Sequence, residues 1–369
     1  MQDSILTLNS NINDNFSVTV LREDGAQVVN INSFKPLIPA SNLKLFTTAY
    51  ALQQLGPKFR LTTTLSLDRR GEFHLFGTGD PDINALHLRL VSNEITNYIS
   101  NDKYEIKKPY VLNIHEENLS YWWPETWSNL DRDKIYGAPI TKLPYSSNSS
   151  STSILNPTKI LKSRLKSFIA DILGDNQLIV NFDRSGISSV LNEQASTVFG
   201  SAPMQSLLSL ANSESHNFTA EVLLRNASNT WNNDKATSNL STWINKQGIN
   251  ANHISIYDGS GLSRLNRLTT HSIASLLWKM SKDKSWYFYR STLSILGIRG
   301  TLTNFDIDNT INGKFYGKTG TLDGVRSISG FIEALDGNAF ISIISNNPLL
   351  QDEEISEIIT LVYYSNSCL

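Results

Sequence analysis

A serine and a lysine three positions apart are the first residues in this sequence that can carry out chemistry. Ser41 and Lys44 begin and end the segment Ser-Asn-Leu-Lys, and in a helix this spacing places both side chains on one face. A serine hydroxyl is a weak nucleophile until a base removes its proton. Lysine can be that base only where burial and a neighbouring cation lower its pKa from about 10.4 toward neutrality. The segment therefore predicts a serine nucleophile with a buried lysine as its base.

Two further motifs can complete such a site. Ser215 and Asn217 enclose a Ser-His-Asn segment, and Lys318 begins the segment Lys-Thr-Gly. Lys318 would be the neighbouring positive charge that lowers the pKa of Lys44. Each motif is weak alone, because the sequence contains other matches to the first two patterns, at residues 163–166, 281–284, 146–148 and 345–347. The matches at 281–284 and 345–347 cannot complete the three motifs in the required order. The match at 163–166 lies in a basic stretch, and the match at 146–148 lies in a Ser/Asn-rich tract.

The Lys-Thr-Gly segment predicts a binding edge for an extended substrate. On an edge strand, this segment lets a substrate backbone add alongside it, and the small Gly320 leaves room for close approach. The backbone N–H groups of Ser41 and Thr321 would then form an oxyanion hole.

The elements that must position these motifs come from both ends of the chain. Alternating residues predict strands near both ends, and helical spacing predicts a helix from Ser41 to Leu55 and another at the C-terminus. The expected strands are residues 16–21, 26–31, 318–322, 325–335 and 339–344, with a turn at Asp336. We therefore expect an α+β fold in which helices flank one five-stranded antiparallel sheet. The segment from about Thr63 to Phe199 differs in composition, with a tryptophan cluster at Trp122, Trp123 and Trp127 and a Ser/Asn-rich tract at 146–153.

Composition and charge exclude several classes of protein. The chain has 369 residues, which suggests two domains, and its 40% hydrophobic content is enough for a sizeable core. A net charge of −2 lacks the basic excess of a nucleic-acid binder. The single cysteine, Cys368, cannot form an intramolecular disulfide. Because the sequence has no HExxH, GxGxxG or Walker motif, we expect no metal and no cofactor.

The ordered SxxK, SxN and KTG motifs are a signature of penicillin-binding proteins and class A β-lactamases. The wider sequence resembles the D-alanyl-D-alanine carboxypeptidases of the PBP4 type, peptidase family S13. Similar blocks extend over nearly the whole chain, at residues 39–47, 77–81, 136–139, 215–225, 258–263, 300–302 and 318–326. The resemblance implies a penicillin-binding/β-lactamase-like transpeptidase domain, residues 1–62 and 200–369, interrupted by an inserted domain, residues 63–199.

The resemblance also implies a role for each motif residue. Ser41 would be the acylated nucleophile and Lys44 the base for acylation. Ser215 and Asn217 would relay a proton and hold the substrate peptide, and Lys318 would support the charge network. Thr319, Gly320 and Thr321 would bind the substrate strand and its terminal carboxylate. His216 departs from the family pattern, which usually has Asp at this position.

The resemblance implies a serine carboxypeptidase, with possible DD-endopeptidase action, that cleaves peptidoglycan peptides ending in D-Ala-D-Ala. β-Lactams would acylate it covalently. A β-lactamase of the same superfamily and a non-catalytic cell-wall binding protein stay open as alternatives. The residues alone indicate a soluble chain with neither an export signal at its start nor a membrane span. The resemblance instead implies a periplasmic or otherwise exported protein.

Overall fold

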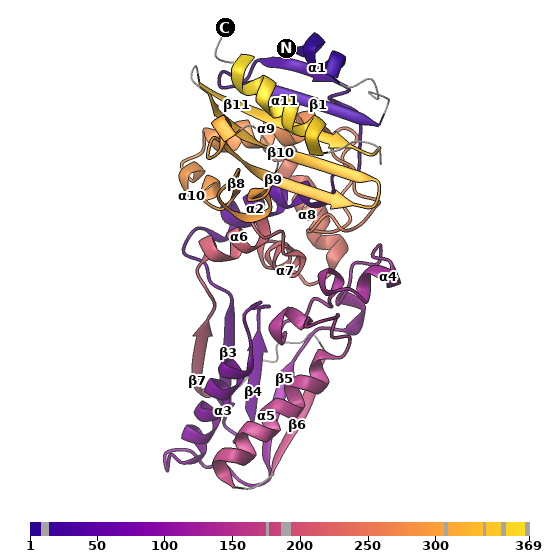
Figure 1. The fold of residues 1–369 in the computed structure, drawn as a ribbon. Coiled ribbons are helices and arrows are strands. Elements are labelled where there is room, and N and C mark those ends of the chain that lie inside the picture. Colours follow the sequence, from indigo (N-terminus) through magenta and orange to yellow (C-terminus); the bar gives the residue numbers. More distant parts are fainter. Residues whose placement is uncertain are drawn as a thin grey trace. The chain divides into compact units, whose positions relative to one another are not determined.

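The computed structural model describes seven stretches of the chain, residues 1–8, 15–174, 177–185, 193–305, 309–334, 337–347 and 352–365. Cys368 and the turn expected at Asp336 lie outside them. Two compact units form: a discontinuous unit, Met1–Lys58 with Met204–Leu369, and an inserted unit, Phe59–Pro203. Figure 1 shows each unit built around its own sheet.

The sheet of the discontinuous unit joins the two ends of the chain. Its strand order is β2-β1-β11-β10-β9-β8, and all of its pairs are antiparallel. The pairing of β1 with β11 links N-terminal and C-terminal segments. The five expected strands are present, and a two-residue strand, β8, adds a sixth. The strands are β1 (Phe16–Arg22), β2 (Gln27–Ile31), β8 (Ser294–Ile295), β9 (Phe315–Leu322), β10 (Val325–Ala334) and β11 (Gly337–Ser345).

Helices cover both faces of this sheet, and the side chains of β1 alternate between apolar residues on one face and hydroxyl-bearing residues on the other. Val18 and Val20 point into the apolar core shared with α11 (Asp352–Ser365) and α1 (Gln2–Leu8). Ser17 and Thr19 point the other way, where both hydroxyls hydrogen-bond to Thr270 at the start of α9 (Thr270–Ser281). The period of two along the strand therefore assigns one helical layer to each face.

The helix that follows Ser41 is enclosed by other helices. A short 3₁₀ helix, η1 (Ala40–Leu43), runs directly into α2 (Lys44–Leu55), and Gly56 in a positive-φ conformation ends it. Every residue from Lys44 to Leu52 is buried, as expected of a helix packed on all sides. Its neighbours include α9 and three further helices, α6 (Met204–Asn212), α7 (Asn217–Ala227) and α8 (Asn233–Lys246). The short α10 (Trp286–Arg290) completes the α-helices described in this unit.

The inserted unit contains a mixed sheet. Its strand order is β6-β5-β4-β3-β7, with β4, β5 and β6 parallel and the other pairs antiparallel. Two long helices share an apolar core with it. The elements are β3 (Thr62–Asp68), β4 (Phe73–Gly77), α3 (Ala85–Ile99), β5 (Tyr110–His115), α4 (Asn129–Arg132), α5 (Pro157–Leu173), β6 (Leu178–Asp183) and β7 (Glu193–Gly200). The other short 3₁₀ helices of the chain are η2 (Leu119–Tyr121), η3 (Ile135–Gly137), η4 (Ser146–Asn148), η5 (Gly300–Leu302) and η6 (Asn309–Ile311).

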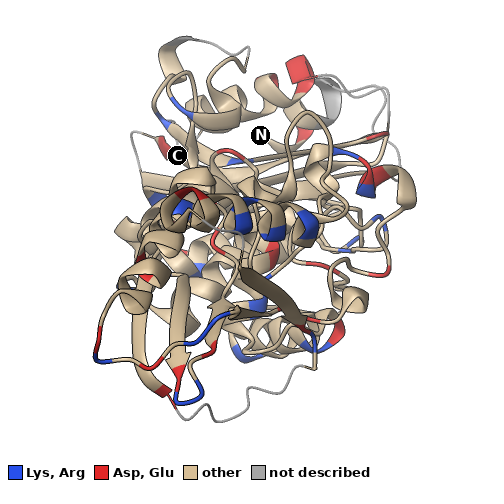
Figure 2. Ribbon diagram, turned by 90° about the horizontal axis from the view of Figure 1, so that it is seen from below, with Lys and Arg blue, Asp and Glu red and all other residues tan. Residues whose placement is uncertain are grey.

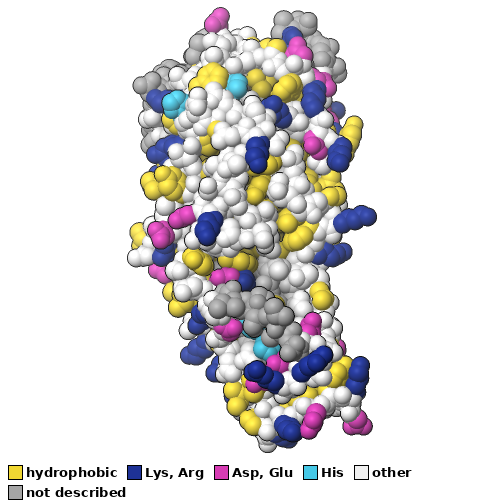
Figure 3. All heavy atoms as spheres, turned by 180° about the vertical axis from the view of Figure 1, so that it is seen from behind, with side chains coloured by type: hydrophobic (Ala, Val, Ile, Leu, Met, Phe, Trp, Pro, Cys, Tyr) yellow, Lys and Arg dark blue, Asp and Glu magenta, His cyan; other side chains and the backbone are white. Residues whose placement is uncertain are grey.

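Charged residues of both signs and small groups of apolar side chains are distributed along the described part of the chain (Figure 2 and Figure 3). Basic and acidic residues are interspersed along the ribbon in Figure 2, in keeping with the net charge of −2. Apolar side chains occur in small groups among polar ones on the face drawn in Figure 3. Among the described helices, none combines the length and the apolar character needed to cross a membrane.

Candidate active site

The structure brings Ser41 and Lys44 into direct contact. Lys44 Nζ lies 3.0 Å from Ser41 Oγ. Ser41 lies in η1 and Lys44 is the first residue of α2, so the continuous helical path places both side chains on one face. Ala40, just before the serine, has a positive φ of 47°. A non-glycine residue held in this region marks a turn whose shape the surrounding packing imposes.

Lys44 occupies a fully enclosed polar pocket. Its Nζ donates to Asn217 Oδ1 at 2.6 Å and to the backbone oxygen of Ser260 at 2.7 Å, and the residue has no exposed surface. Burial disfavours the ammonium form and lowers the pKa of Lys44 to about 7. A substantial neutral fraction therefore exists near neutral pH, with its amine 3.0 Å from the serine hydroxyl.

Two buried carboxyl groups keep the pKa of Lys44 from falling further. The negative charges of Asp258 and Glu221 both favour the ammonium form. Glu221 accepts hydrogen bonds from the backbone N–H groups of Gly259 and Ser260, each at 2.8 Å, and so holds the Ser260 peptide whose oxygen meets Lys44. Burial, followed by the charge of Asp258, raises the pKa of Glu221 itself to about 7.

The carboxyl groups are themselves fixed by further partners. Glu221 lies 3.3 Å from Arg225, one turn along α7, and both side chains are fully buried. Asp258 accepts from the N–H groups of Gly261 and Ser263. These residues were not named as site residues from the sequence, although they fall in the blocks 215–225 and 258–263 on which the resemblance rests. The available signal was the pair Glu221 and Arg225, two charged residues one turn apart that flank the apolar run Val222–Leu224.

The three residues of the Ser-His-Asn segment differ in their contacts with the cluster around Lys44. Asn217 opens α7 and contacts Lys44, as described above. Ser215 has a positive φ of 61°, and among the described interactions its hydroxyl makes no hydrogen bond to Ser41 or Lys44. The ring of His216 instead contacts Thr219 Oγ1 at 2.8 Å. Burial and the nearby charge of Lys44 lower the pKa of His216 to about 4, so the imidazole is neutral near pH 7.

Lys318 is a second fully buried lysine in the same cluster. Its Nζ donates to the backbone oxygen of Thr319 at 2.8 Å. Burial, followed by the charge of Lys44, holds the pKa of Lys318 well below its ordinary range, and the charge of Glu214 acts in the opposite direction. The charge of Lys44 thus acts on Lys318, whereas the sequence predicted the reverse effect, of Lys318 on Lys44, and burial is the cause that lowers the pKa of Lys44.

The strand that carries Lys318 offers an open edge, although β9 is not the outermost strand. β8 pairs with β9 only at Tyr316 and Gly317. Among the described strands, none pairs with β9 on this side from Lys318 to Leu322. Thr321 is exposed there, and Thr319 Oγ1 donates to Thr301 Oγ1 at 2.7 Å. The backbone of an extended ligand can add to this edge.

Gly320 is required by the packing of the serine turn. A Cβ atom at this position would lie 2.9 Å from the backbone nitrogen of Ser41 and would also overlap Ser327 Oγ. The sequence predicted that Gly320 leaves room for the substrate. In the structure, the atoms that approach Gly320 closely belong to Ser41 and Ser327 of the protein. The contact sets β9 directly against η1, which brings the Lys-Thr-Gly segment beside the serine.

The competing Ser-x-x-Lys matches lack this environment. Ser163 and its neighbours Lys162 and Arg164 lie exposed on α5, and Lys284 is exposed in the discontinuous unit. Lys166, which completes the match on α5, is half-buried. Complete burial thus distinguishes Lys44 from the lysines of the other two matches.

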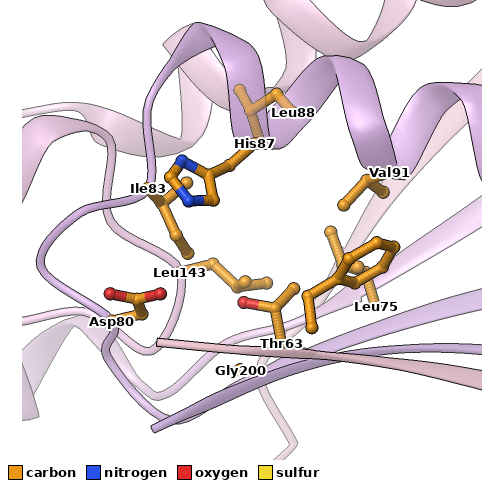
Figure 4. A pocket seen from close by; sticks show the side chains of 10 residues that line it. Thr63, Leu75, Asp80, Ile83, His87, Leu88, Val91, Leu143 and Gly200 are labelled. Carbon is orange, nitrogen blue, oxygen red and sulfur yellow. The ribbon is translucent and has the colours of Figure 1, made fainter. Parts of the chain in front are cut away.

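A separate pocket lies in the inserted unit, between α3 and its sheet. Figure 4 shows Leu88 and Val91 from the helix facing Thr63 and Leu75 from the strands. Asp80 lies at one end of it, and burial raises the pKa of its carboxyl group. The lining contains no paired nucleophile and base, so the pocket does not compete with the serine–lysine cluster as a site of nucleophilic chemistry.

The Ser41 cluster can perform acyl transfer. It combines a hydroxyl nucleophile, an amine poised between its two protonation states, a second buried lysine and an open strand edge. These are the parts needed to attack a peptide-like carbonyl and to hold the substrate in line with the attacking hydroxyl.

Comparisons with known proteins point in the same direction. The model of the D-Ala-D-Ala carboxypeptidase 3 (S13) family matches residues 3–160 and 187–363. The D-alanyl-D-alanine carboxypeptidase of Actinomadura sp. (strain R39) is 24% identical over 419 residues, covering 89% of this chain and 77% of that protein.

Solved structures share the fold at low sequence identity. Penicillin binding protein 4 from Haemophilus influenzae matches with a TM-score of 0.82 and 16% identity, covering 98% of this chain and 99% of that one. A predatory peptidoglycan endopeptidase from Bdellovibrio bacteriovorus matches with a TM-score of 0.64 and 16% identity, covering 95% and 92%.

Proposed function

The chain belongs to the D-Ala-D-Ala carboxypeptidase 3 (S13) family, and we propose that its catalytic residues are Ser41, Lys44, Ser215, Asn217 and Lys318. The protein is a serine-type D-Ala-D-Ala carboxypeptidase of peptidase family S13. The observation that carries the assignment of residues is the 3.0 Å contact between Lys44 Nζ and Ser41 Oγ inside a buried cluster.

The acylation step follows from the geometry around Lys44. Neutral Lys44 accepts the proton of the Ser41 hydroxyl while Oγ attacks the carbonyl carbon of the penultimate D-Ala. The backbone N–H groups of Ser41 and Thr321 stabilise the resulting oxyanion. The peptide bond then breaks, and the leaving amine of the terminal D-Ala takes up a proton relayed through Ser215. Water hydrolyses the ester on Ser41 in the second half of the reaction and restores the hydroxyl.

Substrate binding uses the open edge of β9. The peptide pairs with the backbone from Lys318 to Thr321, which no described strand occupies on this side. Its terminal carboxylate lies against the hydroxyl groups of Thr319 and Thr321, and its negative charge favours the ammonium form of Lys318. A β-lactam presents a carboxylate and a reactive carbonyl to the same groups and forms a covalent ester with Ser41.

The substrate is a peptidoglycan stem peptide ending in D-Ala-D-Ala. The same acyl transfer also cuts D-Ala cross-links when the leaving amine belongs to a neighbouring stem, which makes DD-endopeptidase action part of the proposal. Because peptidoglycan lies outside the cytoplasm, we propose that the protein is exported. In a cell with a periplasm, its destination is the periplasm.

Product analysis tests this function. Purified protein incubated with peptidoglycan peptides is expected to release free D-Ala, and the shortened peptides are identified by mass spectrometry. A long-lived penicillin ester accompanies peptide cleavage in a DD-peptidase. Rapid turnover of penicillin without cleavage of the peptide would instead identify a β-lactamase, and peptide binding without cleavage or acylation would identify a non-catalytic binding protein.

The acylation rate is expected to rise with pH through neutrality. Only neutral Lys44 can accept the serine proton, and its pKa is about 7. Below that value the neutral fraction, and with it the rate, falls about tenfold per pH unit, and above it the rate levels. Single-turnover labelling with fluorescent penicillin between pH 5 and 9 measures this profile. A rate that is constant between pH 5 and 7 would contradict the role of Lys44 as the base.

A further inference from the structure

Three potential metal ligands meet at the β3–β4 hairpin of the inserted unit. Asp68 ends β3, His74 belongs to β4, and Glu72 lies in the connection between them. Each offers one oxygen or nitrogen atom, and these atoms lie within 4.8 Å of one another. The residues are spaced as Asp-x-x-x-Glu-x-His, a pattern outside the histidine-pair motifs tested in the sequence.

His74 presents a buried nitrogen without a hydrogen-bond partner toward these carboxyl groups. The residue is only 7% exposed, and its Nε2 makes no hydrogen bond. The carboxyl oxygen Oδ2 of Asp68 lies 3.5 Å from this nitrogen. That separation is long for an N–H···O hydrogen bond, which usually measures about 2.7–3.2 Å. It is close to the spacing of about 3.4 Å between two ligands bound tetrahedrally to one Zn²⁺ at 2.0–2.2 Å.

Other contacts hold the carboxylates of Asp68 and Glu72 near His74. Asp68 Oδ1 accepts from the backbone N–H groups of Arg70 and Glu72, each at 2.9 Å, which fixes the hairpin turn. Its second oxygen, Oδ2, is the one that faces His74. Asn113 on β5 donates to Glu72 Oε2 at 2.8 Å and restrains that side chain as well.

A chain of polar contacts orients the His74 ring through Nδ1, the nitrogen that does not face Asp68. Its Nδ1 lies 2.9 Å from His115 Nε2, and His115 Nδ1 lies 3.2 Å from Asp183 Oδ2. Because a carboxylate can only accept, His115 carries a proton on Nδ1. In the tautomer of His115 that accepts at Nε2, this contact makes His74 the donor from Nδ1 and directs the lone pair of its Nε2 toward Asp68. A ligating histidine characteristically donates its second ring nitrogen in this way, which fixes its orientation.

We propose that Asp68, Glu72 and His74 bind a Zn²⁺ ion that clamps the end of the β3–β4 hairpin. One imidazole with two carboxylates favours a transition metal over Ca²⁺ or Mg²⁺, which prefer oxygen ligands alone. Three protein ligands leave the fourth position of a tetrahedral Zn²⁺ to water. Through Asn113 and His115 the ion also ties the hairpin to β5, so its role is to stabilise the inserted unit.

Binding of the metal alone tests the proposal. Full-length protein without a histidine tag is treated with a chelator, dialysed against micromolar Zn²⁺, and measured by elemental analysis and thermal unfolding. We expect about one equivalent of Zn²⁺ and a higher unfolding temperature with the ion present. Co²⁺ in place of Zn²⁺ reports coordination through its visible absorption bands, independently of any enzyme activity.

Two variants distinguish this site from general surface binding. Glu72→Gln keeps the side-chain size but removes a charged ligand and is expected to weaken Zn²⁺ binding at least tenfold. His87→Gln changes a histidine on α3 outside the cluster and should leave binding unchanged. Penicillin labelling of Ser41 confirms that each variant is folded. Wild-type protein that retains no Zn²⁺, or equal affinity in wild type and Glu72→Gln, would overturn the proposal.

Discussion

The Ser41→Ala variant is expected to form no covalent adduct with penicillin and to release D-Ala at a rate lower by about 10⁴-fold or more. The proposed reaction proceeds through an ester on Ser41 Oγ, and alanine offers no atom that can form it. Ser41 is only partly buried, and the Lys44 amine keeps its contacts with Asn217 and Ser260. The variant should therefore fold as the wild type does.

Intact-protein mass spectrometry after incubation with penicillin measures this result. The wild type gains the mass of one β-lactam, and peptide mapping places it on Ser41. Ser163→Ala is the matched control, because Ser163 begins a second Ser-x-x-Lys match but lies exposed on α5. An adduct that persists in Ser41→Ala, or disappears in Ser163→Ala, would show that the nucleophile has been wrongly assigned.

The Lys44→Met variant is expected to be acylated about 10²- to 10⁴-fold more slowly than the wild type, the usual contribution of a general base. Methionine approximates the length of the lysine stem and leaves Ser41 in place, but it cannot accept the serine proton. Its effect on stability combines two opposing changes. The oxygens of Asn217 and Ser260 lose their donor, which costs about 1–3 kcal/mol, while a buried charge is removed.

Stopped-flow labelling gives the acylation rate, and thermal unfolding shows that the variant is folded. Lys166→Met is the control, since the half-buried Lys166 completes the match on α5 that begins at Ser163. The residual reaction of Lys44→Met should also lose the rise with pH near 7. Wild-type acylation kinetics in this variant would remove Lys44 from the mechanism even if Ser41 is still labelled.

Local sequence patterns predicted the parts of this fold that depend on neighbouring residues. Alternation along 16–21 and the turn that follows placed the first two strands, and helical spacing placed α2 up to Gly56. The ordered motifs also singled out Ser41, Lys44, Asn217 and Lys318, which the structure gathers into one cluster. These signals are readable because strand and helix periods act over a few residues.

The sequence was less informative where contacts connect distant segments. Nothing local indicates that Glu221 holds the Ser260 peptide against Lys44, since these groups come from α7 and from a loop well beyond it. The two-residue β8 is too short to show a period, so β9 was expected to be an edge strand. The cluster around His74 likewise depends on β5 lying beside β4.

The sequence by itself determined which residues can react. A hydroxyl at Ser41, an amine at Lys44 and their order with the later motifs are properties of the chain and the helical repeat. Only the tertiary structure decided that the Lys44 amine has a neutral fraction near neutral pH. The pKa of Lys44 depends on the helices that exclude water and on the charges of Asp258 and Glu221, and these surround the amine only once the chain has folded.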